Sequence, residues 1–582
     1  MDTEVANDHP AAKSIRLRHT LVNAAGTVVA TAETTAALAP GERRQLAASL
    51  KVNSPALWHP EHPHLHTLRS EVIDANRVAD TRETRIGIRR LAFTPDGLRI
   101  NGERYFPMGY NRHQDHPYVG YALPDSQQYR DVKKLRDAGF TAYRCHYPPS
   151  PAFMDACDEL GVLCIVASPG WQFWNPDPIF LERCIRNTRE MVRRDRNRPS
   201  VILWEPDLNE TPMPAEVIRT LHQAVHEEFP GDQCFTGGEQ GYCDVDYARE
   251  TKSGRPVLTR EWGDSVDDWT SQQGRVRVAR GWGELPLLTQ AQNHAFKLNA
   301  IYEKNGAHDQ CALNGIWLWA GIDAYRGYHQ QPFLGGVLDL FRIPKFSYHF
   351  FRSQRPARPL PLPSGVESGP MVFIANYATP WSPTDVMVFS NCEEVRFSEG
   401  DRVIATQKPD PGYLLKHPPF TFCAGGAGTD KDTWFMNVEA GYHFKPAEYK
   451  AEGLIGGKVV ATHTVKAPMV MTDIRLEPDL EGRPLVADGS DFIRVHAHIT
   501  DKLGTTHPMA NDLVTFSVEG AATLINEASF GANPVAAEAG IATALVRASA
   551  HPGKITVRAT APGLKSAEVV LESAPALGKS LH

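Results

Sequence analysis

Acidic and amide side chains follow a short apolar run in the sequence VILWEPDLNET, residues 201–211. The run Val201–Trp204 has the composition of a strand that is buried on both faces. A carboxyl group at the end of such a strand is partly desolvated, so it can keep its proton at neutral pH and act as an acid. The residues that follow the run and could do this chemistry are Glu205, Asp207, Asn209 and Glu210.

A second carboxyl group stands in a similar position at Glu261, two residues after the short apolar stretch Pro256–Thr259. If these stretches are the fourth and seventh strands of a barrel, Glu210 and Glu261 face each other across its mouth. A separation of about 5–5.5 Å is typical of retaining glycoside hydrolysis. Glu261 would then attack the anomeric carbon, and Glu210 would act first as the acid and then as the base.

The neighbouring charged residues have a different predicted role. Glu205 and Asp207 are two residues apart, so their side chains point to the same side of the strand. This favours structural pairing with arginines of the barrel. Arg260 is expected to face away from the site.

Aromatic residues are frequent near both carboxyl groups, and aromatic walls suit the apolar C–H face of a sugar ring. Those near the two glutamates are Trp171, Trp174, Trp262, Trp317, Trp319, Tyr325 and Tyr328. Trp171 and Trp174 could equally belong to the core.

Strands that alternate with helices predict the scaffold that positions these residues. Four strand–helix units lie between residues 105 and 229, with Asp125 and Ser150 as expected helix N-caps and Gly161 as a helix stop. Four further strands are expected near residues 232–237, 244, 256–261 and 315–321. Eight parallel strands predict a (β/α)8 TIM barrel over residues 93–355.

The flanking regions have the short, turn-bounded runs of β-sandwiches. We predict an immunoglobulin-like β-sandwich over residues 1–92, a Pro-rich linker over 356–364, an accessory β-sandwich over 365–467 and a C-terminal immunoglobulin-like β-sandwich over 468–582. In the strand around Ile493–Ile499, one face is apolar. The opposite face carries His496 and His498, for which solvent exposure is expected rather than metal binding. The predicted fold class is thus multidomain α/β plus all-β.

Composition excludes several functions. The chain has 582 residues, a net charge of −7 and no apolar segment of membrane-spanning length, so neither nucleic acid nor a membrane is expected as a partner. Its nine cysteines contain no CxxC pair, which favours reduced thiols. Without a signal pattern at the start, a cytoplasmic location is expected, although a missing N-terminal segment could change this.

Several separate segments resemble glycoside hydrolase family 2, which contains β-galactosidases, β-glucuronidases and β-mannosidases. They are PALWHPEHPHLHTL at 55–68, GIRRLAF, NGERYFPMGYNRHQDHP, HYPPSPAFMDACDELG, the Asn-Glu pair at 209–210, REWG at 260–263 and GIWLWAGID. The resemblance implies that Glu210 is the acid/base and Glu261 the nucleophile. It also implies that Asn209 binds the sugar 2-hydroxyl, that His113 and His146 contact the sugar, and that Trp319 forms an aromatic floor. Trp171 and Trp262 are further substrate-binding candidates.

The chain also departs from this family. The resemblance implies that this sequence starts after the family's usual jelly-roll domain, and it has Arg144-Cys145-His146 where the family has R-x-S-H-Y-P. No magnesium ligands stand near 167–172, so neither a metal nor another cofactor is expected. The stretch GVLDLFRIPK replaces the Asn-x-Lys pair of β-glucuronidases, which favours a neutral sugar.

The resulting hypothesis is a retaining, β-galactosidase-like exo-β-glycosidase that acts on an oligosaccharide or polysaccharide-derived substrate. The alternatives are a catalytically weak or inactive carbohydrate-binding scaffold, or another family 2 specificity such as β-glucuronidase or β-mannosidase. The oligomeric state stays open, and a homo-oligomer is compatible with the sequence.

Overall fold

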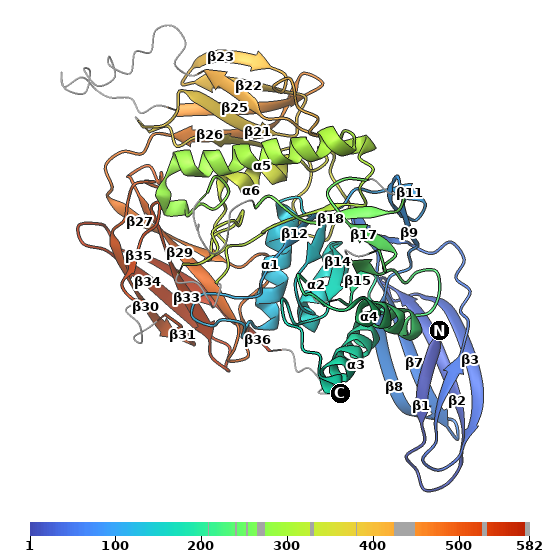
Figure 1. Ribbon diagram of the computed structural model, residues 1–582. Coiled ribbons are helices and arrows are strands. Elements are labelled where there is room, and N and C mark those ends of the chain that lie inside the picture. Colours follow the sequence, from blue (N-terminus) through green and yellow to red (C-terminus); the bar gives the residue numbers. More distant parts are fainter. Residues whose placement is uncertain are drawn as a thin grey trace, which may run out of the picture.

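A nearly closed barrel of eight parallel strands lies at the centre of the protein, with β-sandwiches around it (Figure 1). The computed structural model describes residues 1–207, 209–238, 241–251, 254–264, 274–325, 331–379, 381–423, 448–526 and 532–576. In chain order the barrel strands are β12 (Met108–Asn111), β13 (Ala142–Arg144), β14 (Leu163–Ala167), β15 (Val201–Glu205), β16 (Gly237–Gly238), β17 (Val245–Tyr247), β18 (Val257–Trp262) and β19 (Ile316–Leu318). The two edge strands of this sheet are β15 and β16. The amide of Trp204, in β15, donates to the carbonyl of Phe235, just before β16, at 3.0 Å, so the two edges lie side by side and the ring is nearly closed. The predicted TIM barrel flanked by β-sandwiches is therefore confirmed.

Helices follow the first four strands, as predicted. They are α1 (Asp125–Asp137), α2 (Pro151–Leu160), α3 (Pro178–Asp195) and α4 (Ala215–Glu228); α5 (Glu284–Asn305) and α6 (Phe346–Ser353) follow β18 and β19. The described parts of the connections after β16 and β17, residues 241–244, 248–251 and 254–256, contain no helix. These connections explain why the helix–strand alternation is weak in this part of the sequence.

The helix ends show how local sequence sets these elements. The Ser150 hydroxyl caps α2 by accepting a hydrogen bond from the amide of Phe153 at 3.2 Å, and Gly161 ends α2 in the left-handed region with φ 71°. Both expectations are confirmed. The expectation for Asp125 was wrong by one residue, because extended Pro124 occupies the N-cap and Asp125 is already the first helical residue.

The barrel interior follows from the alternation of side chains along each strand. Ala142 and Leu203 belong to the apolar cluster that fills the amino-terminal part of the barrel, so Arg144 and Glu205, two residues further on, point inward as well. The antiparallel sheet of β9 (Leu91–Thr94), β10 (Gly97–Ile100) and β11 (Glu103–Arg104) adds side chains to the same cluster. Apolar packing thus fills one end of the barrel, and charged side chains occupy the other.

The remaining strands form antiparallel sheets. The N-terminal region pairs β1 (Asp2–Ala6) with β4 (Arg43–Ala47) and contains a sheet of β3 (Val28–Leu38), β2 (Lys13–Asn23), β7 (His66–Asp74) and β8 (Arg77–Ile86). The middle region stacks β20 (Val372–Ala375), β21 (Asp385–Ser390) and β24 (Phe420–Cys423) on β23 (Arg402–Gln407), β22 (Glu394–Glu399), β25 (Glu448–Ile455) and β26 (Lys458–Lys466).

The C-terminal region packs two four-stranded sheets around one apolar cluster. One sheet contains β27 (Asp473–Asp479), β29 (Phe492–Thr500), β33 (Ile541–Ala548) and β31 (Ala522–Leu524), and the other contains β32 (Val535–Ala536), β30 (Leu513–Gly520), β34 (Lys554–Thr560) and β35 (Ala567–Glu572). A short pair, β28 (Val486–Ala487) with β36 (Ala574–Pro575), lies at one end.

The polar face of β29 is buried, which corrects the expectation of a solvent-exposed face. Ile493, Val495 and Ala497 line the sandwich core as predicted. On the opposite face, however, His496 is 6% exposed, because this face lies against α1 of the barrel (Figure 1). A strand that is covered on both sides cannot be recognised from an alternating pattern alone.

Candidate active site

Arg144 organises the charged end of the barrel. Its guanidinium donates to both carboxylate oxygens of Glu205, at 2.7 and 2.6 Å, and to Oε1 of Glu261 at 2.6 Å. The Arg144 side chain is fully buried, so the two carboxylates supply the charge compensation that a buried guanidinium needs. The prediction that Glu205 pairs with barrel arginines is thereby confirmed. Burial alone would raise the pKa of Glu205, but the charges of Arg144 and Arg260 outweigh it and lower this pKa.

Arg260 was expected to face away from the site, and this was wrong. Its Nη1 lies 3.4 Å from Oε1 of Glu205, and its guanidinium lies over the ring of Tyr247. The pairing of β18 with β19 shifts register between Thr259 and Trp262, so simple alternation does not predict the direction of the side chain between them.

Glu261, at the end of β18, is held as a carboxylate. Its Oε1 accepts from Arg144 and lies 3.1 Å from Nε2 of His146. Burial would raise the pKa of Glu261, but the hydrogen bond with His146 and the charge of Arg144 lower it to about 2. An ionised and partly exposed carboxylate of this kind can act as a nucleophile at neutral pH.

Glu210 is bound by side chains from the loop after β14. Its Oε2 accepts from Nε1 of Trp171 and from Nε2 of Gln172, both at 3.0 Å. Glu210 itself is solvent-exposed and adopts φ 51°. The Trp171 ring stacks on His146 with centroids 5.8 Å apart, so a chain of contacts connects Glu210 with the group that touches Glu261.

Aromatic rings form one wall beside Glu261. Trp319 stacks on His146 with ring centroids 5.1 Å apart and an interplanar angle of 9°. His113 meets Trp319 edge-on at 5.5 Å and His146 at 5.6 Å. Asn209 is buried, and its Oδ1 accepts from Arg144 while its Nδ2 lies 3.4 Å from Nε2 of His146. The structure thus places these four candidates in one cluster around Glu261.

Other aromatic candidates lie elsewhere. Trp262 is 5% exposed and packs against His294 of α5 and Phe351 of α6, in the layer between the barrel and its helices. Trp317 fills the barrel core. Trp174 packs edge-on against Phe180 of α3, and Tyr328 lies outside the described residues.

Some site residues had not been assigned a role from the sequence. Arg144 stands two residues after the apolar Ala142, so strand alternation could have indicated that its side chain points into the barrel. Asn111 donates to the carbonyls of Arg260 and Leu318, and Tyr247 donates to Glu205 at 3.2 Å. Gln172 had no such signal, because it lies in a loop.

Known proteins of one enzyme family are similar to this chain. The domain families "Glycosyl hydrolases family 2", "Glycosyl hydrolases family 2, TIM barrel domain" and "Glycoside hydrolase family 2 C-terminal domain 5" match residues 1–89, 92–229 and 474–570. A β-galactosidase from Thermoanaerobacter pseudethanolicus is 32% identical over 545 residues, which cover 89% of this chain and 68% of that protein. The chain belongs to glycoside hydrolase family 2.

Within this family the similarity extends to other specificities. A β-glucuronidase from Formosa agariphila is 24% identical, with 99% of this chain and 58% of that protein covered. The solved structure of a family 2 β-glucuronidase superposes with a TM-score of 0.78 at 21% identity, over 99% of this chain and 60% of that one. The chain therefore spans about three fifths of the length of these two glycosidases.

Two searches over the described residues concern metals and membranes. In those residues, no group of three or more His, Cys, Asp or Glu side chains is placed to hold a metal ion. None of the helices within the described ranges combines the length and the apolar character needed to cross a membrane.

Proposed function

We propose that the protein is a retaining β-glycosidase that removes terminal neutral sugars, in the manner of a β-galactosidase, from an oligosaccharide. The observation that carries this proposal is the Glu261 carboxylate, which is kept ionised by Arg144 and His146 beside an aromatic wall. Support for the sugar class comes from the 32% identity to a β-galactosidase.

The chemistry has two steps. Glu261 attacks the anomeric carbon, and Glu210 gives its proton to the oxygen of the leaving group as the glycosidic bond breaks. Glu210, now a carboxylate, takes a proton from water, and the resulting hydroxide displaces Glu261 from the same carbon. Two inversions at one centre preserve the anomeric configuration.

The remaining cluster residues bind and orient the sugar. Trp319 and His146 offer stacked rings to its C–H face, while Asn209 and His113 offer hydrogen-bonding groups to its hydroxyls. Hydrogen bonds to hydroxyls that strengthen in the transition state would lower the barrier.

A panel of aryl β-glycosides tests the proposal. We expect release of the aryl group from the β-galactoside, with the β-anomer of the sugar as the first product by proton NMR. Glu261→Gln should abolish turnover, and Glu210→Gln should reduce it by about 10²–10⁴-fold. Glu83→Gln is the matched control, because Glu83 is an exposed residue of the N-terminal sheet that pairs with Arg69. The proposal would be refuted if folded protein hydrolysed none of the glycosides in the panel.

The β-glucuronide in the same panel tests a second specificity. The similarity to β-glucuronidases over nearly the whole chain favours its inclusion. If the glucuronide is hydrolysed faster than the galactoside, the proposed mechanism stands and the proposed specificity changes to β-glucuronides.

A further inference from the structure

One carboxylate outside the candidate active site is connected to the chain on both sides of His113. Asp131 lies on α1 and is fully buried. Its Oδ2 accepts from Nε and Nη2 of Arg112, the residue before His113, at 3.0 and 2.7 Å. Arg342 donates to both oxygens of the same carboxylate, from Nε to Oδ1 at 3.1 Å and from Nη2 to Oδ2 at 3.0 Å.

Arg342 extends this connection to the other side of His113. Its Nη2 donates to the backbone carbonyl of Asp115 at 2.7 Å. The side chain of Asp115 in turn accepts from the amide of Tyr325 at 2.6 Å, in the loop after β19. The backbone around His113 is thus linked to Asp131 at two positions, directly through Arg112 on one side and through Arg342 to Asp115 on the other.

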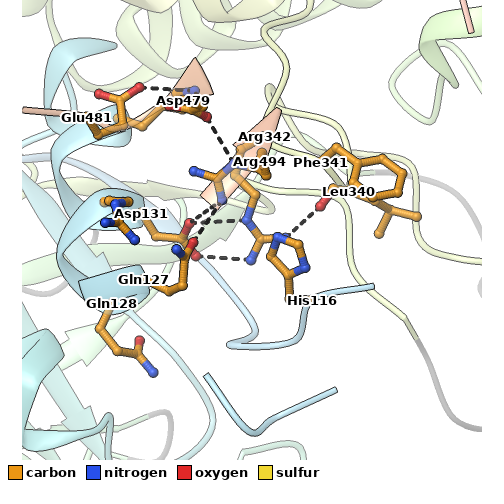
Figure 2. A network of polar contacts seen from close by, with 12 residues as sticks. His116, Gln127, Gln128, Asp131, Leu340, Phe341, Arg342, Asp479, Glu481 and Arg494 are labelled. Carbon is orange, nitrogen blue, oxygen red and sulfur yellow. Dashed lines mark hydrogen bonds and ion pairs between the residues drawn. The ribbon is translucent and has the colours of Figure 1, made fainter. Parts of the chain in front are cut away.

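The C-terminal sandwich takes part in the same network. Figure 2 shows Asp131 facing both Arg342 and Arg494. Arg494, on β29, lies 3.9 Å from Asp131 and donates to Asp479 at 2.9 Å and to Gln127 at 3.1 Å. All these charged side chains are buried, so the loss of one charge would leave others without compensation.

We propose that Asp131 is a positioning residue: through Arg112 and Arg342 it sets His113 against Trp319 and His146 in the sugar site. This rests on the proposed function, because His113 has a catalytic consequence only if that site binds sugar. Through Arg494, the C-terminal sandwich then belongs to the scaffold of the active site.

A double-mutant cycle tests whether Asp131 acts through His113. We expect Asp131→Asn to lower kcat/KM for the aryl glycoside by about 10- to 100-fold, the size of effect that a displaced contact group produces. In a His113→Ala background the same substitution should change kcat/KM by less than about threefold, because coupled sites are not additive. A purely structural role would give the same loss in both backgrounds.

Asp491 offers a matched control in the same interface. It is equally buried and pairs with Arg130 of the same helix at 2.8 Å. Its described partners are Ser126, Arg130 and the amide of Val486, none of which lies in the His113 segment. Asp491→Asn should lower the melting temperature and leave kcat/KM within about threefold in both backgrounds.

Two further measurements keep the result decisive. If Asp131→Asn does not fold, Arg342→Lys replaces it, because a lysine keeps the charge but cannot reach Asp131 and Asp115 together.

Hydrogen exchange of a peptide over residues 112–118 can be measured without enzymatic activity. The exchange should be faster than in wild type in either variant and should stay unchanged in Asp491→Asn. Unchanged exchange, or equal kinetic losses with and without His113, would overturn the inference. Inactive wild-type protein with quickened exchange would refute the proposed function alone.

Discussion

At the scale of single residues, His146 determines how Glu261 titrates. The carboxyl group is buried enough that its pKa would rise, and the hydrogen bond from His146 is the main influence that lowers it to about 2. With Glu261 as the proposed nucleophile, its protonation should limit the activity of wild-type protein only near pH 2 and below.

Replacement of His146 by phenylalanine should move this limit. Without the hydrogen bond, burial is less well opposed and the pKa of Glu261 rises, so the fall of kcat/KM in acid should begin at a higher pH than in wild type, which assays from about pH 7 to about pH 3 would detect. Initial rates on an aryl glycoside over this range measure the change. His146→Gln keeps a donor and should stay closer to wild type; identical acid limbs in wild type and His146→Phe would contradict this assignment.

The sequence predicted the residue types of the site better than their directions. The positions of Glu205 and Glu261 at strand ends followed from the apolar runs before them. The inward turn of Arg260 and the core position of Trp262 depend on the register shift in β18, which has no signature in the local pattern.

At the scale of elements, Gly161 joins α2 to the N-terminal region. It has φ 71°, and a Cβ at this position would lie 2.3 Å from the carbonyl oxygen of Pro60. Because the contact partner is backbone, it cannot move aside as a flexible side chain could.

Gly161→Ala should therefore destabilise the protein by more than the left-handed conformation alone costs, which is about 1–2 kcal/mol. Gly41→Ala provides the comparison, since Gly41 has φ 72° and no atom within 4 Å of its hypothetical Cβ. Calorimetry of the two variants should show the larger fall in melting temperature for Gly161→Ala. Equal falls would mean that the Pro60 contact relaxes at no cost.

Element types were more predictable than element contacts. The first four helices follow from apolar spacing, Ser150 and glycine stops, which are local signals. Contacts between α1 and β29 bury His496 and bring Asp131 close to Arg494. These contacts, such as the Gln127–Arg494 hydrogen bond, join segments more than 350 residues apart, so no local pattern could indicate them.

At the scale of the whole molecule, buried histidines should limit stability in acid. Several have a pKa that burial lowers to about 3 or 4, among them His59, His222, His294, His417 and His463. Such a group takes up its proton readily only in the unfolded chain, near pH 6.5. Its contribution to stability is complete above pH 6.5 and is lost as the pH falls towards the folded pKa.

His294 isolates this effect. It is fully buried between α5 and α6, where burial, and then the charges of Lys297 and Lys345, lower its pKa to about 3. Each pH unit below 6.5 should therefore cost about 1.4 kcal/mol from this residue alone. Asp323 opposes the trend, because burial raises its pKa to about 7 and its contribution to stability grows as the pH falls. Burial also raises the pKa of Asp137 and of Asp158, but the five histidines named above outnumber these three carboxyl groups.

In wild-type protein, melting temperatures should change little between pH 7.5 and pH 6.5 and should fall from pH 6.5 to pH 4.5. His294→Gln should melt lower at pH 7.5, because it loses the packing against Phe351, but its decline with acid should be shallower. His551→Gln, at an exposed position, should follow the wild-type curve. Parallel curves for wild type and His294→Gln would show that this histidine is already protonated in the folded protein, and the acid sensitivity would then have to come from the paired carboxylates such as Asp131 and Glu205.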